Sequence, residues 1–167
     1  MKKFFLPFLA ALVILSGCKG DKKAAFDFNE KLAAISYNLE SKGREFGAEL
    51  QPAMQSNDYS KLSTITTSLK KFIDEKREDL KNTKNVGGSE KLKSAMIEFL
   101  DFEKELISDA FEPFGKLDAS SSEEEKQAAV QNLIKKSEDE GKYLTKVQQA
   151  QKEYADKHGF KLEKKTY

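Results

Sequence analysis

Few side chains in this sequence of 167 residues belong to the types that usually perform covalent or acid–base chemistry. It contains one cysteine, Cys18, and one histidine, His158. Nucleophile–base pairs and haem-attachment motifs need these types in combination, and di-iron helical bundles need a glutamate three residues before a histidine. Neither these patterns nor a phosphate-binding glycine motif occurs in the sequence. The sequence therefore predicts a protein that is not an enzyme and holds no cofactor and no metal.

Two acidic runs, 123–125 and 138–140, raise the question of cation binding. Consecutive residues of a helix point in different directions, so we expect a solvated surface at both runs. Glu140 differs because its helical register points toward the other helices. A polar layer of Ser137 and Glu140 against Lys42 is one interpretation, and such layers fix register at a cost in stability. We expect Glu140 to pair with Lys42 or to lie at the edge of the seam.

Cys18 follows a segment typical of a secretory signal. Lys2 and Lys3 precede an uncharged run of 12 residues, 4–15. A membrane-spanning helix needs about 20 apolar residues, so this run is too short to span. A single cysteine cannot form an internal disulfide, and acylation of Cys18 explains its presence. We therefore expect lipidation at Cys18.

The rest of the sequence reads as four amphipathic helices, because apolar residues recur at steps of three and four. Pro52 should end the first helix, and Asn57 or Asp58 should cap the second. Ser89 should cap the third, and serines followed by glutamates form a capping box before the fourth. Gly159 should end that helix. The expected helices cover 24–54, 58–81, 89–111 and 120–158.

Short connections between four such helices favour an all-α, antiparallel, up-down-up-down four-helix bundle. The predicted organisation is a signal peptide at 1–17, a lipidated cysteine with a short tether at 18–23, the bundle at 24–160 and a basic tail at 161–167. The alternative is a looser helical array in which the fourth helix extends past the others.

This topology sorts the loops between a base near the anchor and a distal tip. Apolar residues at the tip form either a partner-binding surface or a plug that closes the bundle. They are Met54, Tyr59, Phe111, Phe114 and Leu117. Lysines gather at the base, where they hold the bundle against lipid phosphates or remain solvated. They are Lys19, Lys22, Lys23, Lys81, Lys84, Lys91, Lys157, Lys161, Lys164 and Lys165.

The overall charge argues against a nucleic-acid-binding protein. The chain has 29 Lys and Arg against 28 Asp and Glu, whereas nucleic-acid binders are usually strongly basic. We expect no nucleic-acid partner.

Leu15, Ser16, Gly17 and Cys18 resemble the lipobox of bacterial lipoproteins. With its length and its amphipathic helices, the chain resembles the small helical surface lipoproteins of Gram-negative bacteria. The resemblance extends over the whole chain, but only the lipobox is a specific motif. It implies cleavage before Cys18, acylation of that cysteine and a helical domain in the cell envelope. Lys19 at the second mature position, by resemblance to enterobacterial lipoproteins, implies the outer membrane.

The expected function is that of a lipid-anchored envelope or surface lipoprotein with a non-catalytic binding or structural role. The alternative is a carrier or sensor of a small apolar ligand between the helices. The large side chains Phe28, Phe46, Phe72 and Phe99 do not suggest the cavity that this alternative needs. A pocket above about 300 Å³ with convergent polar groups would favour a carrier, a sensor or an enzyme.

Overall fold

The computed structural model describes residues 9–12 and 19–164. Cys18 lies outside the described residues, and so do 1–8 and 13–17 of the predicted signal peptide. The structure therefore neither supports nor contradicts the predicted cleavage and lipidation.

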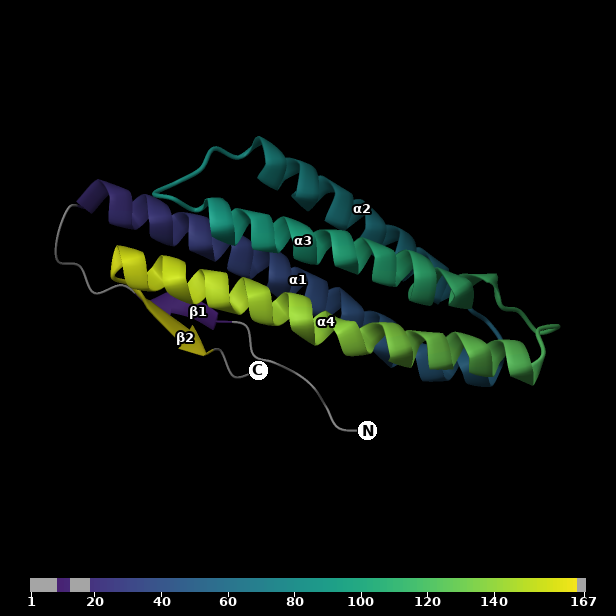
Figure 1. Ribbon diagram of the computed structural model, residues 1–167. Coiled ribbons are helices and arrows are strands. Elements are labelled where there is room, and N and C mark those ends of the chain that lie inside the picture. The colour runs from purple at the N-terminus through teal and green to yellow at the C-terminus, as the bar shows by residue number, and fades with distance from the viewer. Residues whose placement is uncertain (1–8, 13–18, 165–167) are drawn as a thin grey trace.

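Four helices make up nearly all of the described chain, which confirms the predicted all-helical class. They are α1 (Lys19–Ser56), α2 (Ser60–Asn82), α3 (Glu90–Leu106) and α4 (Glu123–His158). Figure 1 shows them lying lengthwise beside one another as a bundle. The turn after α3 consists of a π-helical segment, η1 (Ile107–Phe111), and a 3-10 segment, η2 (Glu112–Lys116).

The first helix is longer than predicted at both ends. Residues 19–23, expected to form a tether, are helical; they contain no proline, and Asp21 in the first turn suits the positive end of the helix dipole. The expectation that Pro52 ends the helix is wrong, since α1 continues to Ser56. Proline removes one helical hydrogen bond, and the chain leaves the helix one turn later at Asn57, which has a φ of 56°.

The ends of α4 follow the predicted capping chemistry. Ser122 Oγ accepts the Glu125 amide, and the Glu125 side chain accepts the Ser122 amide, so the capping box is confirmed. Gly159 ends the helix with a φ of 67°, as predicted. The amide of Phe160 donates to Ala155 at 3.1 Å, which satisfies a terminal carbonyl.

Pro113 accounts for the change of helix type after α3. Its ring crowds the carbonyl of the residue four positions earlier, Asp109. Asn132 of α4 donates its side-chain amide to that carbonyl at 2.5 Å, and Lys136 pairs with the Asp109 carboxylate at 2.6 Å. The π turn is therefore held in place from α4.

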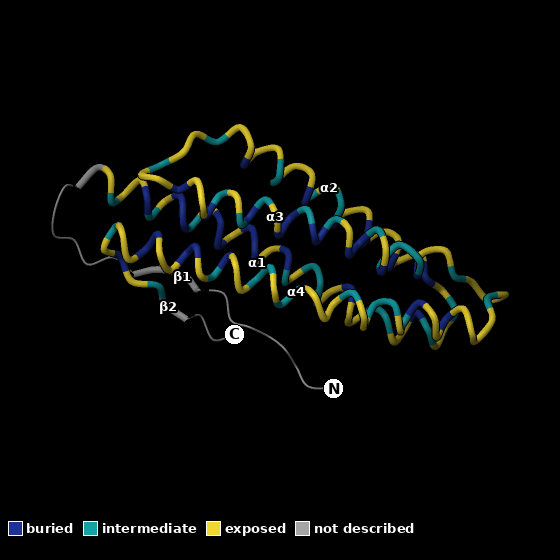
Figure 2. The backbone as a smooth tube through the Cα atoms, viewed as in Figure 1, coloured by how far each residue is buried: buried dark blue, intermediate teal, exposed yellow. Residues whose placement is uncertain are grey.

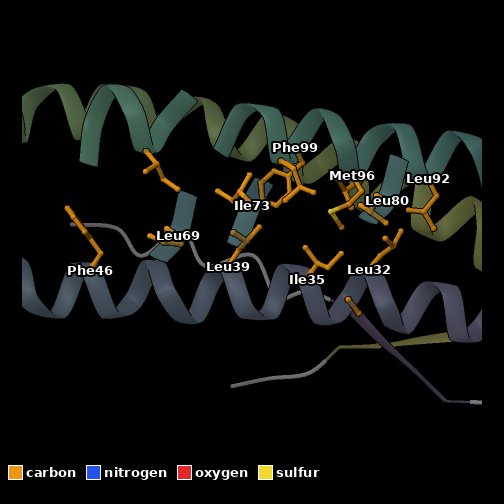
Figure 3. Packing of buried hydrophobic residues seen from close by; sticks show 14 of the residues in the cluster. Leu32, Ile35, Leu39, Phe46, Leu69, Ile73, Leu80, Leu92, Met96 and Phe99 are labelled. Carbon is orange, nitrogen blue, oxygen red and sulfur yellow. The ribbon is translucent and has the colours of Figure 1, made fainter. Parts of the chain in front are cut away.

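The core follows the inward faces of the four helices. Figure 2 shows buried positions facing inward and exposed positions facing solvent. In Figure 3, Met96, Leu80 and Leu92 lie close together, with Leu32 and Ile35 of α1 facing them. Met96 and Leu80 are 0% exposed, so this part of the core is densely packed.

Links between neighbouring helices join early residues of one helix to late residues of the next. The links include Lys31–Thr83 and Lys61–Glu49 between α1 and α2, and Lys91–Glu153 and Lys146–Glu98 between α3 and α4.

A short strand pair adds to the helical fold. Strand β1 (Leu9–Leu12) runs antiparallel to β2 (Lys161–Lys164), with Leu9 opposite Lys164. The predicted basic tail at 161–167 thus begins with a strand. Figure 1 shows the pair beside α4.

Among the described residues, none of the helices combines the length and apolar character that crossing a membrane would require.

Candidate functional site

A cavity of about 260 Å³ lies between α1, α3 and α4. Its apolar walls come from all four helices and from the π turn. Among them, Leu39 and Leu69 lie near each other in Figure 3, with Phe99 farther along. The apolar side chains that line the cavity are Leu39, Leu69, Phe99, Leu106, Ile107, Phe111, Leu133 and Leu144.

The polar side chains of the cavity are three carboxylates, one guanidinium and two hydroxyls. They come from three helices, while α2 contributes only Leu69. This composition, apolar walls with a few converging polar groups, is typical of small-molecule sites. The polar residues are Ser36, Glu40 and Arg44 of α1, Glu103 of α3, and Ser137 and Glu140 of α4.

Glu103 is the most unusual of these residues because it is buried without compensation. It is 9% exposed, and its Oε1 atom has no hydrogen-bond partner among the described residues. The hydroxyl of Ser36, which is 6% exposed, also has none. A buried polar group without a partner costs about 1–3 kcal/mol. Two such groups in one cavity are positions where a water molecule or a ligand can supply the missing partner.

The carboxyls of the cavity affect one another. Burial raises the pKa of Glu103 well above its usual range, and the nearby Glu140 carboxyl raises it further. Burial also raises the pKa of Glu140, with a contribution from Glu40. Arg44 forms an ion pair with Glu40 at 2.6 Å. The cavity therefore has one paired carboxylate and two carboxyls that favour the protonated form.

The turn after α3 shapes one end of the cavity. Phe111 of the π turn lines it and stacks on Phe46 of α1, with ring centroids 4.1 Å apart. Phe114 meets the same Phe46 ring edge-on at 5.9 Å. Because π turns often occur at functional sites, the position of this one beside Glu103 supports a functional role for the cavity.

Of the two alternatives predicted for Glu140, the structure shows the second, a position at the edge of the seam. Glu140 does not pair with Lys42, whose ammonium donates to the Ser68 hydroxyl at 3.0 Å. Glu140 instead lies partly buried at the edge of the seam, beside Ser137 in the cavity lining. The polar layer exists at the predicted level, but it faces a cavity instead of closing on a lysine.

The sequence reasoning did not identify Glu103. A signal was present, because the apolar stripe of the third helix steps by seven from Phe99 to Leu106, and Glu103 occupies the missing position. Similar gaps at Lys42 and Glu140 lie at the same level of the bundle. Comparing the gaps of all three helices would have indicated a polar level in the core, although not a cavity.

The five residues predicted at the tip form a plug more than a surface. Tyr59 is 3% exposed and Phe114 is 0% exposed, so neither is available to a partner. Met54, Phe111 and Leu117 are partly buried and pack against the core. Of the two interpretations offered for the tip, the burial favours the plug.

The base holds the single histidine. His158 Nε2 donates to the Gly87 carbonyl at 2.8 Å, and its ring lies 4.6 Å from that of Tyr154. Of the basal lysines, Lys91 forms an ion pair with Glu153 at 2.5 Å. His158 therefore connects the end of α4 to a loop, and contact of the lysines with lipid remains a prediction.

Within the described part of the chain, no three His, Cys, Asp or Glu side chains come together in a way that could hold a metal ion. Comparison with protein-family models, with curated proteins and with solved structures gave no significant match.

Proposed function

We propose that this chain is a lipid-anchored lipoprotein of the cell envelope whose helical domain binds a small molecule in its central cavity. The single observation behind the binding role is the unpartnered Glu103 in a cavity with apolar walls. In this proposal the domain carries or senses its ligand and does not transform it.

The size of the cavity supports a small ligand. An apolar cavity of about 150 Å³ is enough to bind benzene, whereas pockets for drug-sized ligands begin at about 300 Å³. The cavity in this bundle, at about 260 Å³, falls between these values. A ligand with one ring or a short chain and one polar group fits this volume.

A binding role is better supported than a catalytic role. The cavity lining includes carboxyls and hydroxyls but no histidine and no cysteine among the described residues. A partner-binding tip is less well supported, because Tyr59 and Phe114 are buried.

The proposed architecture is an up-down-up-down bundle anchored through Cys18 to the outer membrane. The reversed links between successive helices support that topology. The α1 helix begins at Lys19, so the anchor and the bundle would be directly connected. Mass spectrometry of the membrane fraction tests the anchor: we expect an acylated Cys18 as the first residue, and loss of the acyl mass in Cys18→Ser. An uncleaved, unmodified chain would contradict the anchor and leave the binding role untouched.

Two glycines of α1 provide a matched test of the binding site. Gly43 lines the cavity and Gly47 does not, and an added Cβ would meet no atom within 4 Å at either position. Leucine at either position should raise helix propensity by a similar amount, but only the side chain at residue 43 would occupy the cavity.

Calorimetric titration of the full chain with phenethyl alcohol, a neutral ring compound with one hydroxyl, measures binding. We expect saturable binding to the wild type and to Gly47→Leu, and a loss of roughly tenfold or more in affinity for Gly43→Leu, since a filled cavity excludes the ligand. Equal affinity in both variants would place the binding elsewhere and contradict the proposal.

A further inference from the structure

We propose that the ligand of this cavity is an organic cation, an amine with a compact apolar body, and that the Glu103 carboxylate is its counter-ion with Glu140 beside it. This inference rests on the proposed binding function and specifies its ligand class.

Two of the three carboxyl groups that face the cavity have no basic partner in the described part of the chain. Glu40 and Arg44 of α1 pair with each other at 2.6 Å. Glu103 of α3 and Glu140 of α4 remain, and no lysine or arginine among the described residues forms an ion pair with either. The lining contributed by α2 carries no charge. The cavity therefore contains two acidic groups for which the described chain supplies no basic partner, and a cationic ligand would supply one.

The burial of Glu103 makes this position unfavourable without a ligand. Its side chain is nine-tenths buried among Phe99, Leu106 and other apolar residues, and Oε1 has no donor. A leucine would fill the same place without an unsatisfied acceptor. An ammonium group presents three donors and forms a charge-assisted hydrogen bond, which is about twice as strong as a neutral one. A bound ammonium group would therefore offset the cost of burying the charged form of Glu103.

The chemistry of the walls distinguishes an organic cation from a metal ion or an anion. A metal needs several converging ligands, and the described residues provide no such group. An anion would face two carboxyls. An amine with an apolar body matches both parts of the cavity, because its carbon skeleton would contact the leucines, and the lining includes the aromatic rings of Phe99 and Phe111, a type of group that attracts cations.

Binding of a cation also implies release of a proton. Burial and Glu140 raise the pKa of Glu103, so the empty cavity favours the carboxylic acid. An incoming ammonium favours the carboxylate, and the proton leaves to solvent. The affinity for the amine should therefore rise as the pH rises from 5 to 8, with Glu40, Arg44 and Glu140 as the other charged groups that face the site.

Three ligands with the same ring and different head groups test the inference. Phenethylamine is a cation at neutral pH, phenethyl alcohol is neutral and phenylacetate is an anion. In calorimetric titrations of the full chain at pH 7, we expect phenethylamine to bind at least roughly tenfold more tightly than phenethyl alcohol, as a hydrogen bond to a charged group implies. Phenylacetate should not bind measurably.

Substitution of the counter-ion gives the second test. Glu103→Gln keeps the shape and removes the charge, so affinity for phenethylamine should fall roughly tenfold while affinity for phenethyl alcohol changes little. Glu105→Gln, on an exposed position of the same helix, is the matched control and should change neither. Glu103→Leu is a second variant that also removes the charge, and it leaves no buried polar group that needs a hydrogen-bond partner. Far-ultraviolet circular dichroism verifies folding of all three.

The outcomes separate the two proposals. Equal affinity for the amine and the alcohol, or unchanged amine binding in Glu103→Gln, would overturn the cationic ligand and leave a neutral binding site. Tightest binding of phenylacetate would overturn it in favour of recognition by Arg44. Failure of all three ligands to bind would overturn the proposed function together with this inference.

Discussion

The two halves of the bundle differ in the hydrogen bonds that their buried polar groups make between chain segments. At the base, the Tyr154 hydroxyl donates to the Val86 carbonyl at 2.8 Å, and the Gln151 amide donates to Asn29 at 2.8 Å. The base is not free of unsatisfied groups, since Asn29 Nδ2 has no partner among the described residues. At the cavity, Glu103 Oε1 has none either, and Glu103 is an ionisable group. The hydrogen bonds of Tyr154 and Gln151 connect separate segments of the chain at the base. Within the described chain, Glu103 makes no such connection at the cavity.

The packing of apolar residues differs in the same way. Leu92 and Met96, toward the base, are at most 1% exposed and pack against α1 and α2. Leu133 and Leu144 are only partly buried and line the cavity. The comparison indicates that the base contributes more to stability than the cavity half, a difference that the proposed binding role would explain.

Two leucine truncations should show the largest contrast. Leu92→Ala removes a fully buried side chain and should lower the free energy of unfolding by about 2–5 kcal/mol. Leu133→Ala, beside an existing cavity and partly exposed, should lower it by about 1 kcal/mol, because less apolar area is lost. Urea denaturation followed by circular dichroism measures both. Equal losses would remove the distinction between the two halves.

Two glycines sharpen the comparison. Gly87 has a φ of 55° and an added Cβ would overlap the His158 ring, so Gly87→Ala should destabilise by about 1–3 kcal/mol. Gly43 in α1 has open space, so Gly43→Ala should stabilise by about 0.5–1 kcal/mol. Thermal unfolding of the two variants measures both effects, and Gly47→Ala serves as a control for helix propensity. A shift of the unfolding midpoint in the same direction for Gly87→Ala and Gly43→Ala would contradict this expectation.

Glu103→Leu should stabilise the empty protein by about 1–3 kcal/mol at pH 7, since it removes an unsatisfied buried acceptor. Because the pKa of Glu103 is raised by folding, the folded state binds more protons than the unfolded state above about pH 4.3. Its contribution to stability therefore falls as pH rises through the folded pKa. The variant should lose this part of the pH dependence, as denaturation at a series of pH values would show; an unchanged profile would contradict it.

Tyr154→Phe should have a small effect, a loss of about 1 kcal/mol, because it removes one hydrogen bond to the loop. Burial raises the pKa of Tyr154 to about 12, so the folded protein keeps a proton that the unfolded chain loses near pH 10. Stability should fall between these values in the wild type and less so in the variant. Ultraviolet titration of the tyrosines would contradict this if the variant lost a group that titrates near pH 10.

The helices were predictable because each depends on local chemistry. The periodic apolar residues, the Ser122 capping box and Gly159 act within one or two helical turns. Pro52 misled the prediction because a proline near the end of a helix removes one bond without forcing the chain out of the helix.

The site was harder to predict because it depends on three helices at once. Glu140 and Lys42 were recognised as polar positions in apolar stripes, but their partners follow from helix rotation, which no single stripe specifies. The π turn depends on Pro113 and on a contact with Asn132, which lies on another helix. Only the folded bundle brings Glu103 to the same cavity.

The start of α1 at Lys19 has a mechanical consequence under the proposed anchor. A helix that begins at the residue after Cys18 leaves no flexible linker between the lipid and the domain, so the bundle would be held close to the bilayer surface. Glu40 lies about 30 Å along that helix at 1.5 Å per residue, a height similar to the thickness of the hydrocarbon layer below it. The mouth of the cavity would therefore open into water at a fixed distance from the membrane, and its ligand would arrive from solution.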